Sequence, residues 1–120
     1  MFGGALGAAS RFAVGTLLLK LYSAAFPLGT FLVNVSGSFL IGVLMMWFVN
    51  RPAINPNWRL FLVTGILGGY TTFSSFEWET FAAWRGGAGA VALLNVLLSV
   101  GLGLGGVWVG ALVSNRFWPR

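Results

Sequence analysis

The sequence predicts an all-α membrane protein with four transmembrane helices, the third of which is broken in mid-membrane. Three observations lead to this prediction. Of the 120 residues, 58% are hydrophobic and only 8% are charged, whereas soluble domains carry about 25% charge. Uncharged runs cover residues 21–50, 60–76 and 86–115, and a spanning helix needs about 20 mostly apolar residues. Eighteen glycines predict close helix packing within one domain, residues 1–120.

The first helix is expected at about residues 2–22 and is the only predicted span with a cation inside it. Lys20 lies near its end and can extend to the interface, but Arg11 lies within the span and should need a polar partner. A signal peptide is an alternative, with "FAVGTLLL" as its apolar stretch and "YSAA" near a cleavage site. It is disfavoured because no basic region precedes that stretch except Arg11 itself.

The other helices are expected at about residues 29–49, 59–84 and 88–114, and the segment "NRPAINPNW" is expected to be a loop. Four indoles fall at or near segment ends, where they prefer the membrane interface: Trp47, Trp58, Trp84 and Trp118.

The charges restrict both partners and orientation. Seven cations are scattered singly, which argues against nucleic-acid binding, and the absence of cysteine and histidine excludes thiolate and imidazole sites. With four spans, Arg51, Arg59, Arg116 and Arg120 lie on the side of the termini, and Lys20 and Arg85 on the other. This bias is weak, so charge alone leaves a single and a dual orientation equally open.

Polar residues repeat at helical spacing in two of the predicted spans. Asn34 and Ser38 share a face with Gly42, and Asn95 and Ser99 share one with Gly103. Such stripes either join helices or line a polar path. The pairs Gly101/Gly105 and Gly106/Gly110 are interpreted as packing faces.

The stretch "GGYTTFSSF", residues 68–76, predicts the break in the third helix. Two glycines and four hydroxyls weaken a helix, and non-helical backbone in a membrane must be buried in protein or line a cavity. Phe73 and Phe76 are three residues apart, and such a pair ordinarily only packs. Ring edges and the hydroxyls of Ser74 and Ser75 nevertheless suit a small anion. Glu77 and Glu79 follow directly and are expected at a vestibule or an interface.

Three segments resemble the Fluc (CrcB) family of fluoride channels: "GGALGAASRF" at residues 3–12, "GTFLVNVSGSFLIG" at 29–42 and "GILGGYTTFSSFEWET" at 65–80. The resemblance extends through all four segments in order. It implies an antiparallel, dual-topology homodimer with two fluoride pores and a central sodium ion. It also implies a multi-pass protein of the cell (inner or plasma) membrane that relieves fluoride toxicity.

The resemblance also assigns residues to roles. Phe73 and Phe76 would supply ring edges to fluoride, Asn34 a pore-lining donor, and Ser74 and Ser75 a polar track. The sodium ion would be held by the backbone carbonyls of Gly68 and Thr71, doubled by symmetry.

In the remaining helices, Arg11 would match the first-helix arginine of the family and Glu79 a vestibule carboxylate. The family often has a tyrosine where this chain has Val91, which weakens the match around Asn95 and Ser99, although Ser99 stays a candidate for the pore. Tyr70 receives no role.

The function predicted is passive fluoride conduction, without enzymatic turnover, because the chain has no phosphate-binding motif and no acids placed as a proton relay. A small multidrug exporter is an alternative, but it needs an acid in the first helix, which has none. A membrane assembly subunit without transport activity is another, but it does not explain the predicted break.

Overall fold

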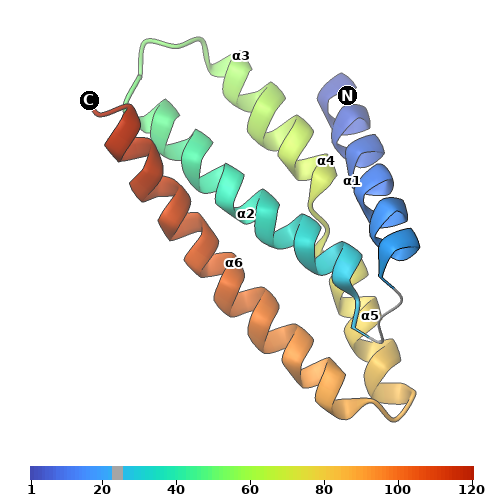
Figure 1. Cartoon of the computed structure of the whole chain (residues 1–120). Coiled ribbons are helices and arrows are strands. Elements are labelled where there is room, and N and C mark those ends of the chain that lie inside the picture. Colours follow the sequence, from blue (N-terminus) through green and yellow to red (C-terminus); the bar gives the residue numbers. More distant parts are fainter. Residues whose placement is uncertain (23–25) are drawn as a thin grey trace.

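The computed structural model describes residues 1–22 and 26–120, and that part of the chain is built from helices and connecting loops (Figure 1). Three helices are continuous: α1 (Phe2–Leu21), α2 (Leu28–Val49) and α6 (Gly89–Phe117). Between α2 and α6 lies a segmented third span, made of α3 (Pro56–Arg59), the π-helical η1 (Leu60–Leu67), α4 (Gly68–Tyr70) and α5 (Phe73–Arg85). The expected all-α fold with a broken third helix is confirmed.

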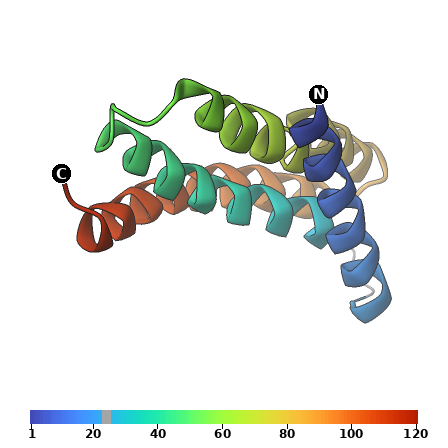
Figure 2. The ribbon, with the colours of Figure 1, turned by 90° about the horizontal axis from the view of Figure 1, so that it is seen from above.

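The four spans alternate in direction, so that α2 and α6 run parallel to each other, and both termini lie at the same end of the molecule (Figure 1). α2 and α6 pack along their length, whereas α1 packs on η1 and α4 and runs at a steep angle to η1 when seen from above (Figure 2). The region proposed as a signal-peptide cleavage site includes residues 23–25 and so falls partly outside the described residues.

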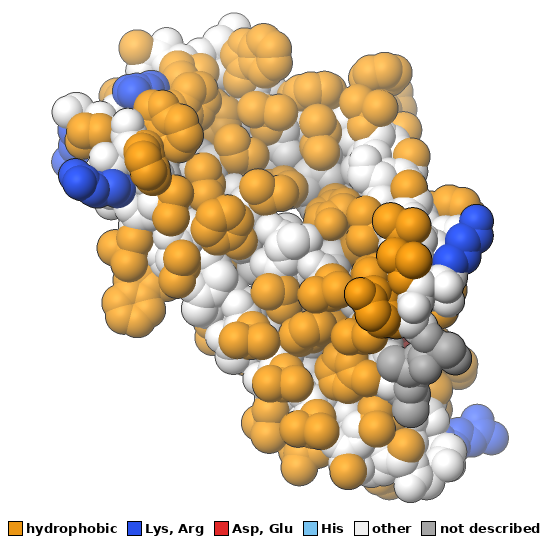
Figure 3. All heavy atoms as spheres, in the orientation of Figure 1, with side chains coloured by type: hydrophobic (Ala, Val, Ile, Leu, Met, Phe, Trp, Pro, Cys, Tyr) orange, Lys and Arg blue, Asp and Glu red, His pale blue; other side chains and the backbone are white. Residues whose placement is uncertain are grey.

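In the described chain, α1, α2 and α6 are each long and apolar enough to cross a membrane. Hydrophobic side chains cover most of the face shown in Figure 3, and the cations lie toward its periphery. The third span reaches a comparable length only when its four pieces are taken together. A membrane protein is therefore the class that the helices indicate.

Glycines explain how α2 and α6 approach each other. A Cβ at Gly42 would collide with the carbonyl oxygen of Val107, and one at Gly110 with the carbonyl oxygen of Phe39. Gly106/Gly110 is thus a packing face, as expected. The same prediction for Gly101/Gly105 is wrong within this chain, because a Cβ at either position meets no described atom within 4 Å.

The break lies at the two threonines rather than at the two glycines. Gly68 is helical (φ −63°, ψ −37°), whereas Thr71 (φ −82°, ψ 156°) and Thr72 (φ −150°, ψ 118°) are extended. The break thus falls within the predicted stretch of residues 68–76, at its hydroxyl residues, while the glycines remain helical. Gly69 serves helix packing instead, because a Cβ there would collide with the backbone of Gly4 in α1.

The third span begins earlier than the expected residue 59. Pro56 takes the first helical position, and the Asn55 side chain caps the helix by accepting a hydrogen bond from the N–H of Asn57 at 3.0 Å. The prolines and asparagines that predicted a loop therefore also form the start of a helix. The π-helical turn that follows was not predicted.

Candidate functional site

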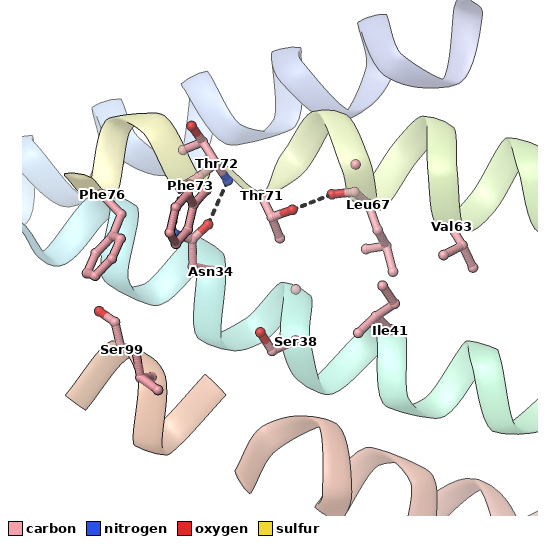
Figure 4. A pocket seen from close by; sticks show the side chains of 13 residues that line it. Asn34, Ser38, Ile41, Val63, Leu67, Thr71, Thr72, Phe73, Phe76 and Ser99 are labelled. Carbon is pink, nitrogen blue, oxygen red and sulfur yellow. Dashed lines mark hydrogen bonds between the residues drawn. The ribbon is translucent and has the colours of Figure 1, made fainter. Parts of the chain in front are cut away.

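A groove of about 330 Å³ lies beside the break, between α2, the third span and α6 (Figure 4). It brings together most of the candidate residues. The lining residues are Asn34, Gly37, Ser38, Ile41, Val63, Leu67, Gly68, Thr71, Thr72, Phe73, Phe76, Ser99 and Val100. Since these residues come from three spans far apart in sequence, only the folded chain forms the groove.

Asn34 holds the broken backbone. Its Nδ2 donates to the carbonyl oxygen of Thr72 at 2.8 Å, and its Oδ1 accepts from the N–H of Thr72 at 2.7 Å (Figure 4). One extended residue inside a membrane protein thus has both backbone groups paired by one side chain. An amide nitrogen carries two donors, so Asn34 has one further N–H for a ligand in the groove.

Thr72 also starts α5. Its Oγ1 accepts from the N–H of Ser75 at 3.3 Å and donates to the Ser75 hydroxyl at 3.1 Å, as a helix N-cap does. Ser75 therefore belongs to the cap, and Ser74 is exposed. Neither Ser74 nor Ser75 lines the groove. The polar track that the resemblance implied at these two residues is therefore not part of the groove.

Phe73 and Phe76 occupy the first turn of α5 and both line the groove. Their ring centroids are 5.7 Å apart, with an interplanar angle of 44°. Phe73 is 69% exposed, so its ring lies at the open side of the groove. The two rings form a short aromatic wall at the N-terminal end of a helix, where the helix dipole favours negative charge.

A chain of hydrogen bonds joins α6 to α5 behind this wall. Ser99 donates to Asn95 Oδ1 at 3.1 Å, Asn95 Nδ2 donates to Thr80 Oγ1 at 2.9 Å, and Thr80 donates to the carbonyl oxygen of Phe76 at 2.8 Å. Asn95 is 2% exposed and does not line the groove, whereas Ser99 does. Asn95 therefore supports Ser99 and the first turns of α5 from behind.

The break leaves carbonyl oxygens free. The hydroxyl and the N–H of Thr71 both donate to the Leu67 carbonyl at 2.9 Å, and the N–H of Thr72 is taken by Asn34. Among the described residues, none donates a hydrogen bond to the carbonyl oxygen of Gly68 or of Thr71. Gly68 is exposed, and both residues line the groove. Free carbonyl oxygens of this kind suit a monovalent cation.

Glu79 lies in a different place from the aromatic wall. Thr30 donates to its Oε1 at 2.8 Å, and its Oε2 is buried with no hydrogen-bond partner in the described chain. It lines a separate cavity of about 480 Å³ between the end of α1, the start of α2 and α5. This carboxylate does not line the groove, so it adds no negative charge to the groove wall. Glu77 is exposed.

Arg11 is half-buried in α1. The expectation of a polar partner is not met, because no hydrogen bond or ion pair to its guanidinium is found among the described residues. α1 approaches the third span closely at Gly3, Gly4 and Gly7, and Arg11 follows these glycines in α1. Val91 is half-buried and does not line the groove.

Sequence reasoning missed two features of the site. Tyr70, which received no role, forms a hydrogen bond of 3.0 Å with the Ser36 hydroxyl, and no local pattern predicts that contact. The capping role of Thr72 had a signal, because threonine is a preferred N-cap residue and Thr72 directly precedes the first residue of α5.

Comparison with known proteins covers nearly the whole chain. Residues 1–111 match the family model described as CrcB-like protein, Camphor Resistance (CrcB). A protein of Solibacter usitatus named fluoride-specific ion channel FluC is 53% identical over 114 residues, which cover 95% of this chain and 93% of the relative. Proteins of the same name from Acidobacterium capsulatum (44% identical; 95% of this chain, 91% of the relative) and Coxiella burnetii (45% identical; 92% and 90%) are also similar.

Proposed function

The chain belongs to the CrcB family, and on this premise we propose that it is a fluoride-selective channel through which fluoride leaves the cell passively. Three curated relatives at 44–53% identity carry the name fluoride-specific ion channel. A channel of this kind is not an enzyme. Its benefit to the cell is relief from fluoride toxicity.

The observation that carries this proposal is the aromatic wall of Phe73 and Phe76 in a groove that also contains Asn34 and Ser99. A phenyl ring has a positive edge, the second N–H of the Asn34 amide is a donor, and the N-terminal end of α5 adds a favourable dipole. Several moderate sites suit conduction, because an ion must bind well enough to enter and weakly enough to leave.

A second copy of the chain would complete the site. The groove is open on one side, and the exposed hydroxyls of Ser36 and Thr64 are unfavourable toward lipid. Gly101 and Gly105 leave room for a close helix contact, because a Cβ at either position would meet no described atom within 4 Å. We propose an antiparallel homodimer of dual topology with two pores, in the inner or plasma membrane of the cell.

The free carbonyls support a structural sodium ion in that dimer. Gly68 and Thr71 offer two oxygens per chain, too few for a cation by themselves. Two-fold symmetry would double the set to four. The ion would supply positive charge at the break and would hold the two subunits together. No cluster of three or more carboxylate, imidazole or thiolate groups exists in the described chain, so backbone oxygens are the natural ligands.

Fluoride efflux from liposomes tests the function. Purified protein is reconstituted into vesicles loaded with potassium fluoride, and valinomycin starts efflux that a fluoride electrode records. The expected result is rapid fluoride release with no release of chloride from matched vesicles. Absence of fluoride release, or equal release of chloride, would contradict the proposal.

A further inference from the structure

Three arginines lie where α2 and α6 end, and one of them bonds to an asparagine that joins the two helices. Asn50 Nδ2 donates to Asn115 Oδ1 at 2.7 Å, and the Nε of Arg120 donates to Asn50 Oδ1 at 3.3 Å. Arg51 and Arg116 directly follow the two asparagines in sequence. We call Arg51, Arg116 and Arg120 the basic patch. Cations are visible at this end in Figure 3, near the C-terminus marked in Figure 1.

No acidic side chain neutralises the basic patch. The two glutamates of the chain lie in α5, at the opposite end of the molecule (Figure 1). The C-termini of α2 and α6 offer partial negative charge, but a helix end supplies only about half a unit. Two ends thus offset about one of three positive charges. The patch therefore keeps a net positive charge, which attracts an anionic group of a ligand.

The position of the patch indicates the ligand. The Arg51 guanidinium lies 5.9 Å from the ring centroid of Trp47, and Trp118 at the end of α6 is 44% exposed. Indoles at the ends of apolar helices mark the level of lipid headgroups, where phosphate groups are dense. Guanidinium pairs with phosphate through two parallel hydrogen bonds.

We propose that the basic patch binds the phosphate group of an acidic phospholipid. The proposal is independent of the fluoride function and of the orientation of the chain, since the patch meets a headgroup layer in either orientation. Asn50 is a positioning residue in this site, because it ties Arg120 to the ends of both helices.

Native mass spectrometry of the purified protein in detergent tests this site. Phosphatidylglycerol and phosphatidylcholine with identical acyl chains are titrated separately, and bound lipids are counted. Wild type is expected to prefer phosphatidylglycerol. In the variant Arg51→Gln/Arg116→Gln/Arg120→Gln the affinity for phosphatidylglycerol is expected to fall by about fivefold per arginine, or on the order of 100-fold.

A matched variant distinguishes a specific lipid site at the basic patch from general electrostatic attraction between the protein and anionic lipid. Lys20→Gln/Arg85→Gln removes two cations from the other end and is expected to bind phosphatidylglycerol as wild type does. Equal loss in this variant, or no loss in the triple variant, would overturn the proposal. Displacement of lipid by an equal concentration of inorganic phosphate would also overturn it, because the ligand would then be free phosphate. If the triple variant does not fold, Arg120→Gln alone is expected to show about a fivefold loss.

Discussion

The side-chain amide of Asn34 in α2 pairs with both backbone groups of Thr72, at 2.8 Å and 2.7 Å, where the third span is broken. An extended residue in a membrane protein has no helical partners for these groups, and each group left unpaired in an apolar environment costs on the order of several kcal/mol. The Asn34 amide therefore stabilises the break by pairing with both backbone groups of Thr72. It also fixes the first turn of α5, and with it the rings of Phe73 and Phe76, against α2.

The substitution Asn34→Asp tests this relationship. It keeps the size of the side chain but removes the N–H donor, so a carboxylate oxygen would face the Thr72 carbonyl. We expect a loss of about 1–3 kcal/mol in stability and loss of fluoride efflux, measured by thermal unfolding in detergent and by the liposome assay. Ser10→Ala is the control, since Ser10 is exposed and bonds only within its own helix. Equal melting temperatures for N34D and wild type would contradict the role.

The aromatic wall makes a second prediction. Phe76→Ile and Phe73→Ile keep apolar bulk but remove the ring edges, so fluoride efflux is expected to fall by on the order of tenfold or more, given that a ring contact contributes about 1 kcal/mol or more. Size-exclusion chromatography is expected to show unchanged assembly. Phe12→Ile, at an exposed ring of α1, serves as the control. Fluoride efflux at the wild-type rate from both Phe73→Ile and Phe76→Ile would contradict a role of the two rings in conduction.

The chain from Ser99 through Asn95 and Thr80 to Phe76 makes a third prediction. Asn95→Ala leaves Thr80 and Ser99 without their partner in a buried site, at an expected cost of about 1–3 kcal/mol. In a double-mutant cycle with Ser99→Ala, we expect a coupling energy of about 0.5–3 kcal/mol between the two positions. Additive changes in unfolding free energy would show that the two side chains act independently.

The sequence predicted the elements of this fold because their causes are local. Apolar runs of spanning length predict α2 and α6, and the hydroxyls of residues 71–75 predict the break. Gly69 was expected to weaken the helix, but it lies in a helical turn because a helix tolerates glycine where a neighbouring helix approaches it. That approach, from Gly4 in α1, depends on tertiary structure and leaves no local pattern.

The candidate site was predictable as a set of residues but not as a set of contacts. Helical spacing marked Asn34, Ser38 and Ser99, and all three line the groove. The pairing of Asn34 with Thr72 joins residues 38 positions apart, and that of Ser36 with Tyr70 joins residues 34 apart. Spacing within one helix cannot specify which backbone group on another span an amide will meet.

The proposed sodium ion makes a fourth prediction, which concerns the free carbonyls of Gly68 and Thr71. Purification with sodium replaced by N-methylglucamine is expected to weaken the dimer and to reduce fluoride efflux, and returned sodium is expected to restore both. The same treatment should leave the helical content unchanged by circular dichroism. A dimer that is equally stable without sodium would contradict a structural role of the ion.

Two glycines in different surroundings give the last prediction. Gly42→Ala places a Cβ against the Val107 backbone, at a close contact between α2 and α6. Since the backbone must move apart, we expect a loss of about 1–3 kcal/mol by thermal unfolding. Gly105→Ala meets no described atom within 4 Å, so the isolated subunit should tolerate it. If a second copy covers Gly105, as proposed, this variant should instead weaken the dimer, measured by cross-linking at decreasing protein concentration. A stable dimer of Gly105→Ala would place the interface elsewhere.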